Sequence, residues 1–172
     1  AAFVSPDDDD DREWFRTGDL VEQGSDGYLT FRGRRKELVV LSTGQNVVPG
    51  PIEESICESS LIEQCLLVGD GWPAVGALVV PDFEAVQQWA DSKGVDLPSS
   101  TARIADDERV RSQIETAVER ATEGVEPHER IEWVALVDEP FTVANGLLTP
   151  TLKKKWRAIT DRYADLIDRQ YE

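Results

Sequence analysis

Short apolar runs and helix-spaced apolar positions alternate along this chain, and together they predict both strands and helices. Strands are predicted where β-branched and aromatic residues gather in short runs, at residues 28–31, 38–41, 64–69, 74–80 and 131–137. Helices are predicted where apolar residues recur every three or four positions, in segments that begin near residues 51, 83, 110 and 156. Pro51 suits the first position of the first of these helices.

The turn residues between these segments predict how the strands pair. Glycines and an aspartate at residues 24–27 join residues 20–21 to the run 28–31 as a β-hairpin. Residues 70–73 favour a turn that pairs the runs 64–69 and 74–80 in antiparallel fashion. The element order therefore predicts an α+β fold in which a small, mainly antiparallel sheet packs with helices, preceded by the hairpin.

The charge of the chain excludes several classes of partner. Its 34 acidic and 18 basic residues give a formal net charge of −16, which argues against nucleic acid and anionic membranes, because both require a cationic face. Only five of the basic residues are lysines, and this acid-rich, lysine-poor balance is typical of proteins from salt-loving organisms. No apolar stretch approaches the ~20 residues of a transmembrane helix, and no signal peptide is recognised, so we expect a cytoplasmic protein.

Two further composition signals concern metal sites and exposed loops. Cys57 and Cys65 lack a partner with metal-ligand spacing, and the sole histidine, His128, is far away in sequence. We therefore expect no metal site and interpret both cysteines as small buried hydrophobes. Five consecutive aspartates at residues 7–11 repel one another and predict an exposed loop.

Two segments in the first third of the chain carry residues suited to binding a nucleotide. In Thr17-Gly18-Asp19, a carboxylate follows a glycine at the start of a strand, where it can accept two hydrogen bonds from a ribose diol or can simply cap a turn. In the segment 33–53, Arg34 offers a fork of donors for phosphate or ribose oxygens, and Gly44 permits a sharp turn near a ligand. By residue type alone, a solvated charged turn also fits this second segment.

Three lysines near the end of the chain form the third candidate site. Thr149 and Pro150 suit the cap and first position of the last helix, which would place Lys153, Lys154 and Lys155 at its N-terminal end. Cations are unfavourable there because the helix dipole is positive, so the cluster predicts an anionic ligand. The alternative is that the lysines neutralise surrounding carboxylates. We expect Lys153 to be held in place by the preceding turn, and Lys154 and Lys155 to be solvated.

The order of these three segments resembles the C-terminal signature of the adenylate-forming superfamily of acyl-CoA synthetases, peptide-synthetase adenylation domains and luciferases. Thr17-Gly18-Asp19 matches the T-G-D motif, Gly33-Arg34-Arg35-Lys36 matches the G-R-x-[DK] hinge, and Thr149 to Lys153 matches T-x-x-G-K with leucine in place of glycine. The segments 63–71 and 145–153 are most similar to long-chain fatty acyl-CoA synthetases.

The resemblance implies a role for each matched residue. Asp19 would bind the ribose hydroxyls of ATP, Arg34 would assist at the nucleotide, and Lys36 would be the hinge. The CoA-facing loop would be Ser42-Thr43-Gly44, and Lys153 would be the catalytic lysine. Residues 1–35 would end the large nucleotide- and acyl-binding domain, and residues 36–172 would form the mobile lid.

The implied reaction is a two-step, AMP-forming ligation of a long-chain fatty acid to CoA. ATP with Mg²⁺ first activates the carboxylate as an acyl-adenylate, and CoA then attacks that adenylate after the lid rotates. The fragment alone is expected to be inactive, because the phosphate loop, adenine pocket and acyl tunnel belong to the large domain. Three alternatives are a ligase for aryl or short-chain acids, a non-catalytic interaction module with the lid fold, and a stand-alone anion-binding domain.

Overall fold

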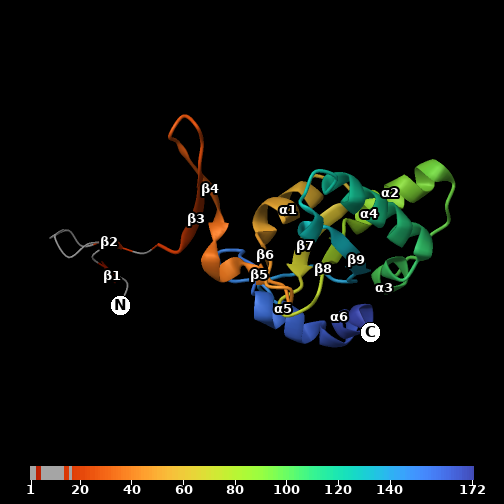
Figure 1. Ribbon diagram of the computed structural model, residues 1–172. Helices are drawn as coiled ribbons and strands as arrows, with labels where there is room; N and C mark the ends of the chain where they lie inside the picture. The colour runs from red at the N-terminus through yellow and green to blue at the C-terminus, as the bar shows by residue number, and fades with distance from the viewer. Residues whose placement is uncertain (1–2, 5–13, 16) are drawn as a thin grey trace.

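A three-stranded sheet forms the centre of the computed structural model, which describes residues 3–4, 14–15 and 17–172 (Figure 1). The strands lie in the order β7 (Ile62–Val68), β8 (Val75–Pro81) and β9 (Ile131–Leu136). β8 pairs antiparallel with β7 and parallel with β9. A parallel neighbour needs a long crossover, which the helical segment between β8 and β9 supplies. The predicted pairing of residues 64–69 with 74–80 is confirmed.

Both faces of this sheet are buried, so its strands are apolar on both sides. Alternate residues of the sheet belong to two separate cores; Cys65 and Leu67 of β7 face one, and Leu66 and Val68 face the other. All seven residues of β8 are buried. This pattern explains why the sequence shows continuous apolar runs rather than strict alternation.

Helices cover each face of the sheet. The first core lies under α1 (Pro49–Ile56), α2 (Phe83–Lys93), α3 (Thr101–Ala105) and α4 (Glu108–Ala121), and the second under α5 (Trp156–Arg162) and α6 (Ala164–Tyr171). The α+β prediction is therefore confirmed, although α3 was not predicted. The first helix begins at Pro49, two residues before the predicted start.

The final helix predicted from a single apolar stripe is in fact two helices. The break lies at Tyr163, whose backbone leaves the helical region at φ −106° and ψ 20°. Its ring packs against Phe141 with centroids 6.3 Å apart. The change of direction lets α6 bring Ile167 into the second core and Tyr171 onto Trp133, with ring centroids 5.3 Å apart.

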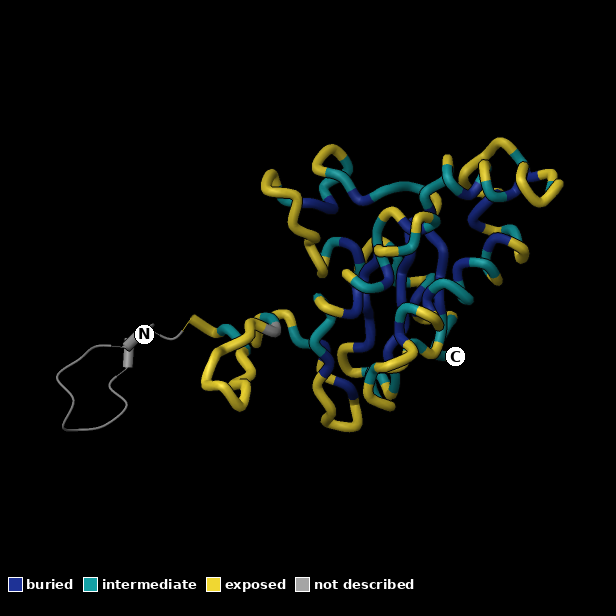
Figure 2. The backbone as a smooth tube through the Cα atoms, turned by 90° about the horizontal axis from the view of Figure 1, so that it is seen from above, coloured by how far each residue is buried: buried dark blue, intermediate teal, exposed yellow. Residues whose placement is uncertain are grey.

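A hairpin extends from one end of this layered body (Figures 1 and 2). It consists of β3 (Asp19–Gln23) and β4 (Leu29–Arg34), which pair antiparallel as predicted. Large apolar side chains stay exposed on it, with exposed fractions of 53–77 % for Val21, Tyr28, Leu29 and Phe31. Thus the hairpin carries an apolar surface without a partner among the described residues.

Shorter elements link the hairpin to the body. A 3-10 turn, η1 (Arg35–Glu37), leads into the two-stranded pair β5 (Val39–Val40) and β6 (Asn46–Val47). The predicted buried strand at 38–41 is thus wrong in extent: Val39 is buried, but Val40 is 44 % exposed because β5 pairs only with β6.

A second 3-10 turn, η2 (Pro127–Glu129), precedes β9, and β1 (Phe3–Val4) pairs with β2 (Trp14–Phe15).

Two expectations from composition concern a transmembrane helix and an exposed acidic loop. Within the described residues, no helix combines the length and apolarity needed to cross a membrane. The aspartate run at residues 7–11 lies outside the described residues.

Candidate functional site

The hairpin brings together the two residues predicted to bind a nucleotide. Asp19 and Arg34 are cross-strand partners, and the Arg34 Nε lies 3.2 Å from the Asp19 Oδ1. Both side chains remain partly accessible, at 28 % for Asp19 and 44 % for Arg34. The Asp19 Oδ1 is nevertheless buried and accepts no hydrogen bond from the described residues, so its contact with Arg34 is purely ionic.

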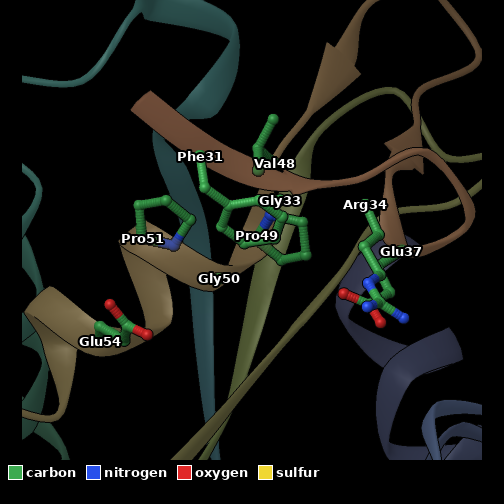
Figure 3. Close-up of a pocket in the computed structure, with 9 residues that line it drawn as sticks. All are labelled: Phe31, Gly33, Arg34, Glu37, Val48, Pro49, Gly50, Pro51 and Glu54. Atoms are coloured by element: carbon green, nitrogen blue, oxygen red, sulfur yellow. The ribbon is translucent and has the colours of Figure 1, made fainter. Parts of the chain in front are cut away.

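A cleft of about 260 Å³ lies beside this ion pair, between the hairpin and the start of α1. Figure 3 shows Arg34 and Glu37 on one side of it, Pro51 and Glu54 on the other, and Pro49 between them beside Gly33. The hairpin backbone lies close to the Val48 side chain here, since a Cβ at Gly33 would lie 2.8 Å from the Val48 Cγ1. Glycine at this position therefore permits the hairpin to pack against the body.

The predicted hinge residue lies where the hairpin ends. Lys36 is exposed in η1, two residues after the last residue of β4. The Arg35 N–H donates to the Gly18 carbonyl over 2.8 Å and so ties this turn to the start of the hairpin. The predicted division of the chain after residue 35 falls inside η1.

The predicted CoA-facing loop forms the tip of the β5–β6 pair. Ser42, Thr43 and Gly44 are all exposed. The Gly44 N–H donates to the Leu41 carbonyl over 2.8 Å, the Leu41 N–H donates to the Gln45 carbonyl over 2.9 Å, and Gly44 has a φ of 84°. This is a three-residue hairpin loop, whose last position requires the left-handed conformation that glycine adopts readily.

The three lysines lie in a turn and not in a helix. Helix α5 begins at Trp156, so the prediction that Thr149 and Pro150 cap it is wrong. Instead the Thr149 Oγ1 accepts the N–H of Lys153 over 3.0 Å, and a bridge pairs Leu148 with Lys154. Thr149 lies seven residues before the first residue of α5, which is too far for it to cap that helix, and its hydroxyl serves the turn instead. Lys153 thus follows the tip of a tight hairpin.

This lysine turn repeats the hydrogen bonding of the loop formed by Ser42, Thr43 and Gly44. The Leu152 N–H donates to the Thr149 carbonyl over 2.9 Å, and the Thr149 N–H donates to the Lys153 carbonyl over 2.8 Å. Leu152 therefore occupies the position that Gly44 holds in the other loop. It is the one described non-glycine residue with positive φ, at 60°. Leu152 thus adopts the backbone conformation expected of the glycine in the T-x-x-G-K pattern.

Replacing Leu152 with glycine is expected to increase stability. The left-handed conformation costs a residue with a Cβ about 1–2 kcal/mol, while glycine gains unfolded-state entropy of about 0.4–1 kcal/mol. Because the Leu152 side chain is 71 % exposed, little apolar burial is lost. We expect a net gain of about 0.5–1 kcal/mol by chemical unfolding. Leu152→Ala keeps the Cβ and is the control; an equal gain in that variant would contradict the argument.

The lysines differ in their contacts. Lys154 makes an ion pair with the Glu53 Oε2 and donates to the Cys65 carbonyl, while its side chain stays 32 % exposed, so the expectation that it is solvated holds only in part. Lys153 and Lys155 are exposed and make no side-chain ion pair within the described residues. The interpretation that the lysines neutralise nearby carboxylates therefore holds for Lys154 alone.

Sequence reasoning missed Glu53, which is 9 % exposed and is the partner of Lys154. Glu53 lies on α1 between Ile52 and Ile56, so an acid next to the buried stripe was the available signal. Both cysteines adjoin the pair. Burial raises the pKa of the Cys57 thiol and raises that of Cys65 well above its usual value. The interpretation as a small buried hydrophobe is confirmed for Cys65, whereas Cys57 is only half-buried.

No hydrogen bond or ion pair connects Lys153 to Asp19 or Arg34 in the described part of the chain. The structure therefore brings together the two residues of the hairpin and separates them from the lysine turn. The described residues also contain no group of three or more acidic, histidine or cysteine side chains arranged to hold a metal ion.

Comparison with known proteins identifies the family. Residues 36–172 match the model of the AMP-binding enzyme C-terminal domain. The chain is 35 % identical over 158 residues to the long-chain-fatty-acid–CoA ligase FadD15 of Mycobacterium tuberculosis, covering 92 % of this chain and 26 % of that protein. It is 34 % identical to the probable acyl-activating enzyme 16 of Arabidopsis thaliana, covering 95 % of this chain and 24 % of that protein.

A solved structure shows the same fold. The adenylation–carrier didomain of a carboxylic acid reductase from Segniliparus rugosus, in complex with AMP, superposes with a TM-score of 0.73 at 25 % identity. The match covers 95 % of this chain and 21 % of that one. The chain spans about a quarter of the length of the curated relatives described above. It belongs to the family of C-terminal domains of AMP-binding, adenylate-forming enzymes.

Proposed function

We propose that this chain is the C-terminal part of an ATP-dependent, AMP-forming long-chain fatty acid–CoA ligase. The observation that carries the proposal is Lys153, whose unpaired side chain follows a residue held in the left-handed conformation of the family's glycine. The relatives' names supply the substrate class, since FadD15 is a long-chain-fatty-acid–CoA ligase.

In this proposal the hairpin serves the nucleotide. Asp19 accepts hydrogen bonds from the ribose hydroxyls of ATP, and its partly exposed carboxylate beside Arg34 supports that role. Arg34 is held beside it and lines the adjacent cleft, from which its guanidinium can meet nucleotide oxygens. Mg²⁺ would accompany the triphosphate of ATP.

Lys153 would act in the first half-reaction. A fatty carboxylate attacks the α-phosphate of ATP, and the ammonium group stabilises the negative charge shared by the carboxylate and phosphate oxygens as pyrophosphate departs. The lysine must reach the nucleotide held by Asp19 and Arg34, which it does not contact in this arrangement. A rotation about Lys36, in the turn between hairpin and body, is the movement that we propose brings them together.

The second half-reaction would use the other loop. After adenylation the same rotation in reverse removes Lys153 and presents Ser42, Thr43 and Gly44 toward the tunnel for CoA. The exposed loop tip, with its positive φ at Gly44, lets backbone approach a ligand closely. The CoA thiol then attacks the acyl-adenylate and releases AMP.

The exposed apolar side chains of the hairpin support the proposal that this chain is part of a larger protein. Four large apolar side chains of the hairpin formed by β3, β4 and their turn are more than half exposed, which is unfavourable unless another surface covers them. We propose that residues 1–35 end the large nucleotide- and acyl-binding domain and that this domain covers the hairpin. Residues 36–172 then form the mobile lid.

The net charge of −16 suggests the environment of the complete enzyme. We propose that it works in the cytoplasm of a salt-loving organism, where concentrated salt shortens the Debye length to about 3 Å at 1 M and screens the self-repulsion of the acidic surface.

Turnover of the complete protein tests the proposal. With ATP, Mg²⁺ and CoA, it is expected to release AMP and form acyl-CoA from fatty acids of long chain, faster at about 1 M than at 0.1 M salt because screening stabilises the fold. The 172-residue chain alone serves as the control and is expected to be inactive. Turnover restricted to aryl or short-chain acids would refute the substrate class, and no AMP release with any acid would refute the ligase.

A further inference from the structure

The outer edge of β7 is closed by side chains instead of a fourth strand. β7 is the edge strand of its sheet, so the N–H and C=O groups of Cys65 and Leu67 that face away from β8 need other partners. The Glu53 Oε1 accepts the Leu67 N–H over 2.8 Å, and Lys154 donates to the Cys65 carbonyl. The Trp156 Nε1 donates to the Leu67 carbonyl over 3.4 Å.

Lys154 and Glu53 are the central pair in this arrangement. Glu53 is nearly buried, and its two carboxylate oxygens are used separately, one for the Leu67 N–H and one for the Lys154 ammonium group. Lys154 also reaches a backbone carbonyl of β7, so its ammonium group bridges α1 and the sheet. A buried, doubly used carboxylate with a paired cation holds its partner firmly, because separating them leaves an uncompensated charge.

The ion pair between Lys154 and Glu53 determines the direction of the neighbouring lysine side chains. Lys154 lies in an extended segment, where it forms a bridge with Leu148, and successive side chains in such a segment point to opposite sides. With Lys154 directed into the sheet edge, Lys153 is directed away from it. The Lys155 N–H donates to the Leu147 carbonyl over 2.9 Å and fixes the other end of the segment.

We infer that Lys154 and Glu53 are positioning residues for the adenylation half-reaction, because their ion pair pins the turn that presents Lys153. This inference rests on the proposed function of Lys153. Neither residue touches a substrate; both act through the geometry of residues 149–154. The lid therefore uses two of its adjacent lysines differently, one as an anchor and one as the reacting group.

Substitutions in the complete enzyme test this division of roles. Lys154→Met keeps the aliphatic stem and removes the ammonium group, and Glu53→Gln keeps an acceptor for Leu67 while removing the charge. Each is expected to lower the kcat of fatty-acid-dependent ATP–pyrophosphate exchange roughly 10- to 100-fold, since small misplacements of a reacting group have effects of this size. The KM for ATP and thioester formation from supplied acyl-adenylate should stay within about twofold. Lys155→Met is the matched control and should retain both activities.

A structural measurement on the 172-residue chain separates anchoring from simple loss of folding. In the unsubstituted chain, acetylation by a water-soluble reagent, followed by mass spectrometry, should modify Lys153 and Lys155 faster than Lys154. Glu53→Gln should bring the rate at Lys154 up to that of Lys155 while the circular dichroism spectrum is unchanged. Equal rates at the three lysines in the unsubstituted chain would overturn the inference.

The outcomes distinguish this inference from the proposed function. If Lys153→Ala abolishes pyrophosphate exchange but Lys154→Met and Glu53→Gln leave it intact, the positioning role fails and the proposed function stands. If Lys153→Ala has no effect on exchange, the proposed function of Lys153 fails. Loss of both half-reactions together in Lys154→Met would indicate general damage to the lid and would also overturn the positioning role.

Discussion

Lys153→Ala in the complete enzyme is expected to reduce acyl-adenylate formation by at least about 10²–10³-fold, the usual effect of removing a charge-stabilising donor from a transition state. Lys153 is exposed, lies just after an ordered turn and makes no ion pair in the described part of the chain, so the substitution should leave the fold intact. ATP–pyrophosphate exchange with a long-chain fatty acid measures this step. Thioester formation from supplied acyl-adenylate and CoA measures the other step and should be unaffected.

The comparison of the two half-reactions makes this prediction specific. A lysine that only stabilises the lid would affect both steps, whereas a lysine used in adenylation affects the first alone. Lys155→Ala is the natural control, because Lys155 is also exposed and lies two residues away. Equal loss of both activities in Lys153→Ala would contradict the role that we propose.

Gly76→Ala is expected to destabilise the domain by about 1–3 kcal/mol, the usual range for overpacking a filled core. Gly76 lies on the central strand β8 opposite Trp133 of β9, and a Cβ at this position would lie 2.0 Å from the Trp133 Cε2. The indole cannot simply move aside, since it contacts the Tyr171 ring edge-on and Tyr171 in turn stacks on Trp72 at 4.2 Å. Chemical unfolding of the 172-residue chain, followed by tryptophan fluorescence, measures the loss.

The same aromatic group fixes the end of the chain. The Tyr171 hydroxyl donates to the Ala74 carbonyl over 2.8 Å, and burial raises its pKa to about 12. A displaced Trp133 should therefore also loosen α6. Gly124→Ala is the matched control, because a Cβ there meets no atom within 4 Å, and its stability should change by less than about 0.5 kcal/mol. An equal loss in both variants would refute the packing argument.

Much of the fold was predictable, because the spacing of apolar residues along the chain reflects which side of each helix or strand is buried. The β3–β4 hairpin, the antiparallel pairing of β7 with β8, and the helices α2 and α4 all lie where the sequence places them. The failures have tertiary causes. The Tyr163 break follows from its packing on Phe141, and β5 is short because it stays outside the main sheet.

The candidate site was predictable only in part, for related reasons. Asp19 and Arg34 were expected to serve one ligand, and strand register brings them together. The helix-dipole argument for the lysines was wrong, because the threonine of the preceding turn bonds to Lys153 and the helix starts three residues after that lysine. Nothing local in the sequence shows that Lys154 meets Glu53, since the two are 101 positions apart.

That separation along the chain has a consequence for synthesis on the ribosome. The edge of β7 has its full set of partners only when residues 154 and 156 have left the exit tunnel, although the strand itself emerges about ninety positions earlier. Throughout that interval the nascent domain exposes the unpaired carbonyls of Cys65 and Leu67 on an apolar edge strand, and such edges are prone to pair with a neighbouring chain. The C-terminal segment is thus the last part of the chain that prevents β7 from pairing with another copy of the protein. Truncations before residue 154 should therefore aggregate in cells.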